Sequence, residues 1–324
     1  MQKIEAEKFF KIQRKFSHIP FSQSEGWYNY MASKKNKIVF FVDNEEDSKI
    51  AFWGREQKIP LGLGCVLRID GECYQPDLSD QVFTKVYSSI IEMEYTGIEI
   101  DSATLYNINY EIGLRRAGFV SPISLSSCPL SIEIDFIQPL DFNRNWQRNV
   151  KKAIKSDLIF SEITDPDAVI LNRIVDMFKE MAQLKNLGYQ LEFDSLTSLT
   201  SSKDIRVFMV NNRDGRPIAA RIIHEHNKYL TDIYAANSIE ARDCGATYFI
   251  MDAILNKLKE EGKSYFDFGR IPPSNHSTDS VYVFKISSRG KKVQYNGEWV
   301  YYKNPIIEGL MYLYKRFIIK KQRY

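Results

Sequence analysis

One pattern of residues occurs twice in this chain, far apart, and it limits the folds that the chain can adopt. Helical spacing of apolar residues predicts one helix over 80–95 and another over 247–261, and a glycine ends each of them. A short strand and an aspartate follow, first over Gly97 to Asp101 and later over Gly262 to Asp267. Repetition at this separation predicts two related α+β domains instead of a solenoid. Chance is the alternative, because helix–glycine–strand is a common order.

The length of the chain also favours two domains. A single hydrophobic core rarely serves more than about 250–300 residues, and this chain has 324. We expect a first domain over 1–130 and a second over 131–324, with the boundary inside the region 121–142. In this division the C-terminal helix can pack back on the first domain.

Composition excludes several classes of protein. The four cysteines have no CxxC spacing, and His224 and His226 have no evident third ligand, so we expect no metal site. A net charge of +3 is too small for a general nucleic-acid coat, so any polyanion must meet a local patch. The N-terminal segment is too charged for a signal peptide, and the longest apolar runs are far too short to span a membrane. We therefore expect a cytoplasmic protein.

Three strands are expected in succession within 206–236. They read RVFMVNN, PIAARIIHEH and YLTDIYAA, and Asp214–Gly215 is a strong hairpin signal between the first two. A helix that starts near 242–246 follows, and this order resembles an N-acyltransferase core, in which a glycine turn offers N–H groups to the pyrophosphate of coenzyme A (CoA). Only Arg242 and Gly245 fit the usual R/Q-x-x-G-x-G/A pattern, because Thr247 replaces the last small residue. The turn argues against CoA, and we expect no cofactor.

A candidate site lies within 262–299. Asp267 stands among aromatic strand formers just before a glycine, where burial is costly unless the carboxylate is hydrogen-bonded or faces a cleft. A polar loop over 272–280 follows, and VYVFK at 281–285 is expected to be a second strand that ends on Lys285. Two strands that end on ionisable groups suggest a site at a sheet edge. The alternative is a surface loop in which Asp267 caps the turn.

A basic helix face is expected over 141–156. Arg144, Arg148, Lys151, Lys152 and Lys155 have offsets that place all five on one side of a helix. Like charges at this spacing repel, so a phosphate clamp is one interpretation, with Arg148 suited to bidentate contact and Lys152 beside it. A solvated polar face is the other interpretation.

Four segments follow one another in this chain: RNVKKAIK at 148–155, AANSIEARDCGA at 235–246, GKSYFDFG at 262–269 and VYVFKISSRG at 281–290. Their order resembles that in the Fem family of peptidoglycan-bridge aminoacyltransferases, the methicillin-resistance factors of cell-wall biogenesis. QSEGW at 23–27 and RIDGECYQPD at 68–77 fit more loosely. A long helical arm and a glycine–proline pair that family members have are missing.

The resemblance implies two tandem GNAT-like folds, each with a mixed central sheet flanked by helices. It implies transfer of an amino acid from aminoacyl-tRNA to a peptide amine of a peptidoglycan precursor that is nucleotide-linked or lipid-linked. By this resemblance Arg148 meets the precursor phosphates, and Phe284 and Lys285 line the channel near the acceptor. Tyr74 and Asp77 supply polar contacts from the first domain, and Tyr234 lies beside the last strand of 206–236.

The proposed chemistry needs positioning and a proton acceptor. An aminoacyl ester is already activated, but the attacking amine must lose a proton. Asp267 or Asp77 could take it, and Lys285 could stabilise the oxyanion. An ordinary lysine at a strand end, lying over aromatic rings, is the alternative for Lys285.

Two other functions remain open. One is an acyl-CoA-dependent N-acyltransferase that acts on a sugar or peptide amine in cell-surface polymer synthesis, and the other is a non-catalytic binder of a nucleotide-linked partner. The altered glycine turn favours aminoacyl transfer over the first of these. Basic residues at the C-terminus, from Lys315 to Arg323, are compatible with contact at the inner face of an anionic membrane, or with an ordinary docking helix.

Overall fold

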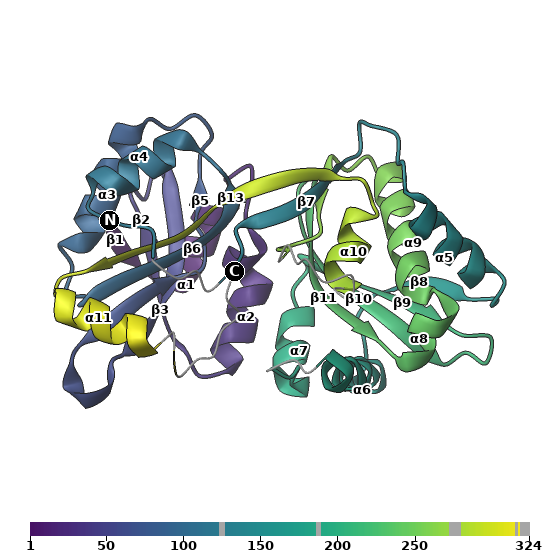
Figure 1. The fold of residues 1–324 in the computed structure, drawn as a ribbon. Coiled ribbons are helices and arrows are strands. Elements are labelled where there is room, and N and C mark those ends of the chain that lie inside the picture. Colours follow the sequence, from purple (N-terminus) through teal and green to yellow (C-terminus); the bar gives the residue numbers. More distant parts are fainter. Residues whose placement is uncertain (123–126, 186–188, 272–279, 315–316, 318–324) are drawn as a thin grey trace. The chain divides into compact units, whose positions relative to one another are not determined.

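The computed structural model describes residues 1–122, 127–185, 189–271, 280–314 and 317, and the chain divides into two compact units (Figure 1). Unit 1 comprises Met1–Gln23, Lys35–Ser131 and Val293–Tyr324, and unit 2 comprises Ser24–Lys34 and Ile132–Lys292. The expected domains were continuous in sequence. The compact units are discontinuous in sequence, because Ser24–Lys34 belongs to unit 2 and Val293–Tyr324 belongs to unit 1.

A mixed sheet forms the centre of unit 1, with strand order β1-β2-β3-β4-β6-β13 and β5 paired to β3. Only β4 and β6 are parallel among these pairs. β2 and β3 form an antiparallel hairpin, and Asp43 holds its turn by accepting the N–H groups of Lys49 and Ile50 at 2.9 and 3.0 Å. The strands are β1 (Gln2–Ile4), β2 (Lys37–Val42), β3 (Ile50–Lys58), β4 (Cys65–Ile69), β5 (Cys73–Tyr74), β6 (Gly97–Leu105) and β13 (Lys291–Tyr302).

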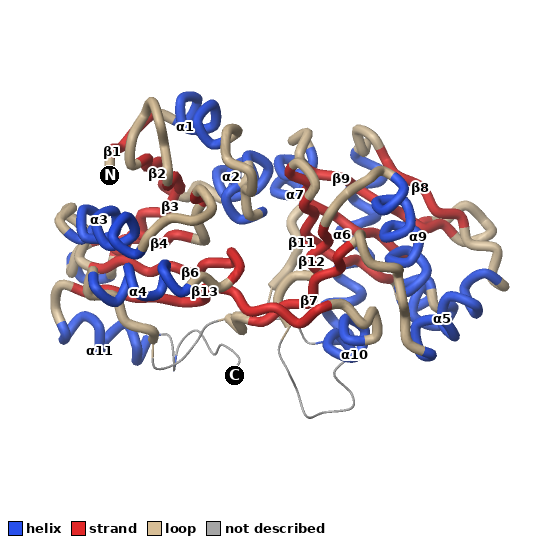
Figure 2. Tube along the Cα trace, turned by 90° about the horizontal axis from the view of Figure 1, so that it is seen from above, coloured by secondary structure: helices blue, strands red, loops and turns tan. Residues whose placement is uncertain are grey.

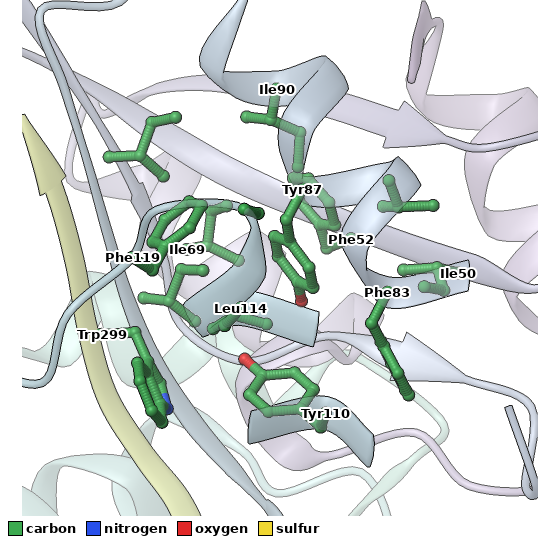
Figure 3. Close-up of a cluster of buried hydrophobic side chains, with 14 of the residues drawn as sticks. Ile50, Phe52, Ile69, Phe83, Tyr87, Ile90, Tyr110, Leu114, Phe119 and Trp299 are labelled. Carbon is green, nitrogen blue, oxygen red and sulfur yellow. The ribbon is translucent and has the colours of Figure 1, made fainter. Parts of the chain in front are cut away.

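Two helices, α3 (Asp80–Ile91) and α4 (Ile108–Arg116), cover the core of unit 1 (Figure 3). Phe83, Tyr87 and Ile90 recur at helical spacing on α3 and are completely buried, as the apolar pattern predicts. Gly113 lets the two helices touch, because a Cβ there would stand 2.3 Å from the Cβ of Phe83. The remaining helices of the unit are α1 (Ala6–Gln13) and α11 (Pro305–Leu313), with short 3-10 turns over Phe21–Gln23 and Pro60–Gly62.

Unit 2 has its own mixed sheet, with strand order β7-β12-β11-β10-β9-β8. The predicted succession of three antiparallel strands is confirmed as β9, β10 and β11, and β12 pairs parallel to β11. This arrangement matches the expected α+β class. The strands are β7 (Leu130–Asp135), β8 (Ile159–Ile163), β9 (Ile205–Asn211), β10 (Pro217–His226), β11 (Tyr229–Asn237) and β12 (Tyr265–Asp267).

Helices pack on both faces of this sheet (Figure 2). On one face, α2 (Glu25–Ser33), α6 (Ala168–Lys185) and α7 (Phe193–Thr200) form a core with Ala220 and Ile222 of β10. Arg221 stands between these two residues in β10, so its side chain is on the opposite face of the sheet. Its guanidinium lies over the Phe284 ring, which places α10 on that opposite face. The other helices are α5 (Arg144–Ile154), α8 (Ile239–Cys244), α9 (Ala246–Glu260) and α10 (Ser280–Ile286).

Two expectations about local structure are corrected or limited. The segment VYVFK is not a strand but part of α10, in which Phe284 is buried among aromatic rings. Within the described ranges, no helix exceeds the 18 residues of α6, so a long helical arm is absent there, and none is long and apolar enough to cross a membrane.

Candidate functional site

Lys285 projects from α10 toward the carboxyl end of β12. Its Nζ donates to the carbonyl oxygens of Phe268, Gly269 and Arg270 at 2.5, 3.1 and 3.0 Å. Burial lowers the pKa of Lys285 to about 8, although neighbouring carboxylates oppose the shift. An ammonium has three N–H groups, and all are used here. Lys285 therefore fixes the chain after β12, and must release a carbonyl before it can donate to a reaction intermediate.

Asp267 is the last residue of β12 and accepts the N–H of Gly269 at 2.7 Å. It therefore does cap the turn, as the alternative interpretation of this segment expected. Gly269 is required in this turn, since its φ is +71° and a Cβ would stand 3.2 Å from the carbonyl oxygen of Asp232. β12 and β11 pair in parallel over three residues. The turn keeps the chain after β12 close to β11 past the end of this pairing.

Glu133 is a further carboxylic acid beside Asp267, and no pattern in the sequence indicated its presence at this site. It is half-buried on β7 and lies directly opposite Asp267 in the antiparallel pairing of β7 with β12. Directly opposed residues have side chains on the same face of a sheet. Burial, and then the charge of Asp267, raise the pKa of Glu133 to about 7. A carboxylic acid that titrates near neutral pH is suited to accept a proton.

Arg221 and Asp232 form a buried ion pair near Lys285, with 2.7 Å between Nη1 and Oδ2. Their side chains are only 5% and 6% exposed. Burial raises the pKa of Asp232, and Arg221 and then Lys285 oppose that shift. Asp232 Oδ1 and Arg221 Nε are buried and make no hydrogen bond in the described part of the chain. The sequence did contain a signal for this pair, because each is a charged residue inside an otherwise apolar strand.

Phe284 lies inside an aromatic cluster. It stacks on Trp146 of α5 with 5.3 Å between ring centres and meets Tyr248 of α9 edge to face at 5.0 Å. Only 7% of the residue is exposed. Phe284 therefore joins α10 to α5 and α9, and in this structure it supports the position of Lys285 from within the core.

Arg148 and Lys152 lie on the exposed face of α5, as the helical offsets predict. Together with neighbouring side chains they line a shallow hollow formed by Arg144, Gln147, Arg148, Lys151, Lys152 and Lys155. Trp146 is buried and lies two residues before Arg148, which places the two side chains on opposite sides of the helix. The structure therefore brings the basic residues together with one another, but not with Lys285.

Tyr234 lies on the other face of the unit 2 sheet from Phe284. Its hydroxyl donates to the hydroxyl of Tyr30 in α2 at 3.2 Å, and its ring packs edge to face on Phe178 of α6. Burial raises the pKa of Tyr234. Tyr234 thus joins α2 to the sheet.

The two predicted residues of the first domain lie in unit 1. Tyr74 is half-buried, and its hydroxyl accepts the side-chain amide of Asn296 at 3.2 Å. Asp77 is exposed and has a left-handed φ of 64°. Glu72, which is buried, follows β4 in sequence and precedes Tyr74. Desolvation raises the pKa of Glu72 to about 7, although the hydroxyl of Ser102 donates to its carboxylate at 3.0 Å. Unit 1 therefore has its own buried polar cluster near Tyr74.

The turn that would bind pyrophosphate in an N-acyltransferase is covered by α5. Gly245 separates α8 from α9 with a φ of +84°, and a Cβ there would stand 2.5 Å from the main-chain carbonyl oxygen of Asn149. The hydroxyl of Thr247 donates to Asn237 at 3.1 Å and also occupies this turn.

The weaker candidates add no chemistry. His224 is buried, which lowers its pKa to about 3, and within the described ranges no cluster of three or more His, Cys, Asp or Glu side chains could hold a metal ion. The loop 272–279, with His276 and Ser277, lies outside the described residues, as do the basic C-terminal residues Lys315 and Arg316 and those over 318–324.

Comparison with known proteins identifies the fold. Residues 141–282 match the family described as acetyltransferase (GNAT) domain, and no curated protein sequence matches the chain. The crystal structure of FemX is similar with a TM-score of 0.77 at 12% identity, over 96% of this chain and 100% of FemX. L-PGS from Bacillus licheniformis is similar with a TM-score of 0.65 at 14% identity, over 96% of this chain and 97% of L-PGS. Residues 141–282 thus form a GNAT-type domain, and the whole chain has the tandem GNAT-like fold of the FemX structure.

Proposed function

We propose that this chain is an aminoacyltransferase that moves an amino acid from aminoacyl-tRNA to a peptide amine of a peptidoglycan precursor. The observation that supports the choice of donor is the close approach of Asn149 to Gly245, because an N-acyltransferase offers the N–H groups of this turn to the pyrophosphate of CoA. The likeness to FemX supports the fold on which this activity is proposed. Aminoacyl-tRNA and a nucleotide-linked precursor are both cytoplasmic, so we place the reaction in the cytoplasm. A lipid-linked precursor would place it at the inner face of the membrane.

The groups around β12 have the chemistry that such a transfer needs. Glu133 has a pKa near 7 and lies opposite Asp267, so one of this pair accepts the proton of the attacking amine. Lys285 holds the turn after β12 and, on releasing one carbonyl, donates to the oxyanion. An activated ester needs no covalent intermediate on the protein, so positioning of the two substrates supplies most of the rate. Tyr74 and Asp77 remain proposed contacts to the precursor.

The second candidate is an acyl-CoA-dependent N-acyltransferase acting on a sugar or peptide amine. It is favoured by the match of residues 141–282 to an acetyltransferase domain. A third candidate, a non-catalytic binder of a nucleotide-linked partner, is the reading that remains if neither donor is used.

The deciding experiment supplies the protein with a nucleotide-linked peptidoglycan precursor and one donor at a time. One donor is a mixture of charged tRNAs, and the other is acetyl-CoA. Mass spectrometry of the precursor detects the transferred group. We expect a mass increase of one or more amino-acid residues with charged tRNA only. An acetylated product would move the assignment to the second candidate, and an unmodified precursor with both donors would favour the binder.

A further inference from the structure

The exposed face of α5 carries five cations that the proposed reaction does not yet use. We propose that this face binds the sugar–phosphate backbone of the donor tRNA, an inference that rests on the proposed aminoacyl transfer. The basic face is defined as Arg144, Arg148, Lys151, Lys152 and Lys155.

The charges of the basic face are not neutralised by the protein. In the described part of the chain none of the five makes an ion pair with a carboxylate, and Arg148 bonds only to the neutral side chain of Asn145 at 2.9 Å. The helix carries no acidic residue between Arg144 and Ile154. Neighbouring cations repel one another on a helix. A bound polyanion would relieve this repulsion.

The inner side of α5 holds the basic face rigidly. Trp146 is fully buried, donates through its indole N–H to Asp252 of α9 at 2.9 Å, and stacks between Phe142 and Phe284. Ala153 is also fully buried. Both views of the fold show α5 lying along α9 (Figures 1 and 2). The cations are therefore presented on a fixed platform, which lowers the entropy cost of binding.

The dimensions of the basic face favour a long polyanion over a single diphosphate. Arg144 and Lys155 are 11 positions apart, which corresponds to about 16 Å along a helix. The two phosphates of a nucleotide-linked precursor would meet only part of this length, whereas successive phosphates of an RNA strand can meet all of it. Basic residues that follow a nucleic-acid backbone in this way bind without reading sequence.

A membrane surface fits the basic face less well. Helices that lie on membranes combine a basic face with apolar side chains that enter the lipid. On α5 the large apolar side chain that is exposed is Ile154, at 61%. The apolar side of the helix is instead used for packing through Trp146. RNA is therefore the occupant that the side chains favour.

The basic face and Lys285 belong to elements that pack on one another within unit 2. Trp146 of α5 stacks on Phe284, which is the residue before Lys285 on α10. The basic face lies on the side of α5 away from Trp146, so the proposed contact is with the tRNA backbone and not with its reactive end.

The test compares two triple variants with equal loss of charge. Arg148→Gln, Lys151→Gln and Lys152→Gln are combined in one variant, and Lys49→Gln, Lys58→Gln and Lys85→Gln, three exposed lysines of unit 1, in the control. Binding of fluorescein-labelled, uncharged tRNA is measured by anisotropy over a range of salt concentrations. We expect the α5 variant to bind about tenfold or more weakly, with a salt dependence reduced by about one unit per lost contact, and the control to resemble the parent.

Further measurements distinguish the other occupants. Equal tRNA affinity in the parent and the α5 variant would overturn the proposal. Loss of binding to vesicles of phosphatidylglycerol and phosphatidylcholine, with tRNA affinity unchanged, would assign the face to a membrane. A higher KM for the precursor alone would assign it to acceptor phosphate. Because uncharged tRNA is the probe, failure of the transfer reaction would contradict the proposed function without deciding the RNA-binding result. Thermal unfolding checks folding, and removal of the repelling charges should not lower the Tm.

Discussion

Arg221 and Asp232 face each other across β10 and β11 as an ion pair with almost no contact with solvent. Removal of one partner leaves the other charge buried and unpaired, which typically costs about 3–5 kcal/mol. We therefore expect Asp232→Ala to lower the free energy of unfolding by about that amount. The double variant Arg221→Met, Asp232→Leu should be close to the parent in stability, because no unpaired charge remains.

Urea unfolding of Arg221→Met, of Asp232→Leu and of the double variant measures this coupling as a double-mutant cycle. Additive losses in the double variant would mean that the pair does not interact. If the double variant is stable but inactive, the pair has a role in transfer beyond support of the fold.

Lys285→Met should reduce turnover by roughly a hundredfold or more, the usual cost of losing one electrostatic contact at a reacting centre. Met keeps most of the side-chain bulk, but it removes the three hydrogen bonds from Lys285 to the carbonyls of Phe268, Gly269 and Arg270. Hydrogen bonds to a charged group typically contribute about 1.5–3 kcal/mol each, so we also expect the free energy of unfolding to fall. Steady-state kinetics together with chemical unfolding of the same variant would measure both effects.

Lys285→Arg serves as the matched control for charge. A planar guanidinium cannot place three donors as an ammonium does, so we expect Arg to restore little of the turnover. Full activity of Lys285→Met would remove Lys285 from the reaction and leave it a structural role at the end of β12. Full activity of Lys285→Arg alone would show that a guanidinium can replace the ammonium.

Glu133 should make stability depend on pH. Its pKa rises from 4.5 to about 7 in the folded chain, so between these values the folded chain holds a proton that the unfolded chain has lost. The stabilisation from this proton is fully present below about pH 4.5 and is lost as the pH rises through about 7. Glu133→Gln should therefore flatten the fall in the free energy of unfolding across this window.

Urea unfolding between about pH 5 and pH 8 tests this expectation. An unchanged slope in Glu133→Gln would show that the carboxyl group titrates normally. If Glu133 is also the proton acceptor, the parent's rate should rise through about pH 7 and the variant should lose that rise.

Gly245→Ala should destabilise the chain more than Gly215→Ala. Both glycines have left-handed φ values, +84° and +78°, so both substitutions bear a backbone cost of about 1–2 kcal/mol. At Gly215 an added Cβ meets nothing within 4 Å, whereas at Gly245 it meets the carbonyl oxygen of Asn149. Thermal unfolding of the two variants gives the difference, and equal losses would mean that α5 moves away easily.

The parts of the fold that depend on local sequence were predicted correctly. The strands β9, β10 and β11, the Asp214–Gly215 turn and the one-sided cations of α5 follow from patterns of a few residues. The segment 281–285 was predicted wrongly because Val, Tyr and Phe favour strands by propensity, and only the packing of Phe284 against Trp146 selects a helix.

The candidate site was less accessible to sequence. The opposition of Glu133 and Asp267 depends on the register of two strands more than 130 positions apart, which no local pattern contains. The three carbonyl contacts of Lys285 join residues only 15, 16 and 17 positions apart, but they need 281–285 to be a helix, whereas the propensity of this segment indicated a strand. Arg221 and Asp232 could have been found, because a charge inside an apolar strand requires a partner when buried.

The close approach of α5 to Gly245 has a consequence for the substitutions that this turn can accept. The contact is with the main chain of Asn149, so no change of the Asn149 side chain would make room for a Cβ at position 245. A larger residue there would require α5 to move, and the cations that α5 carries would move with it.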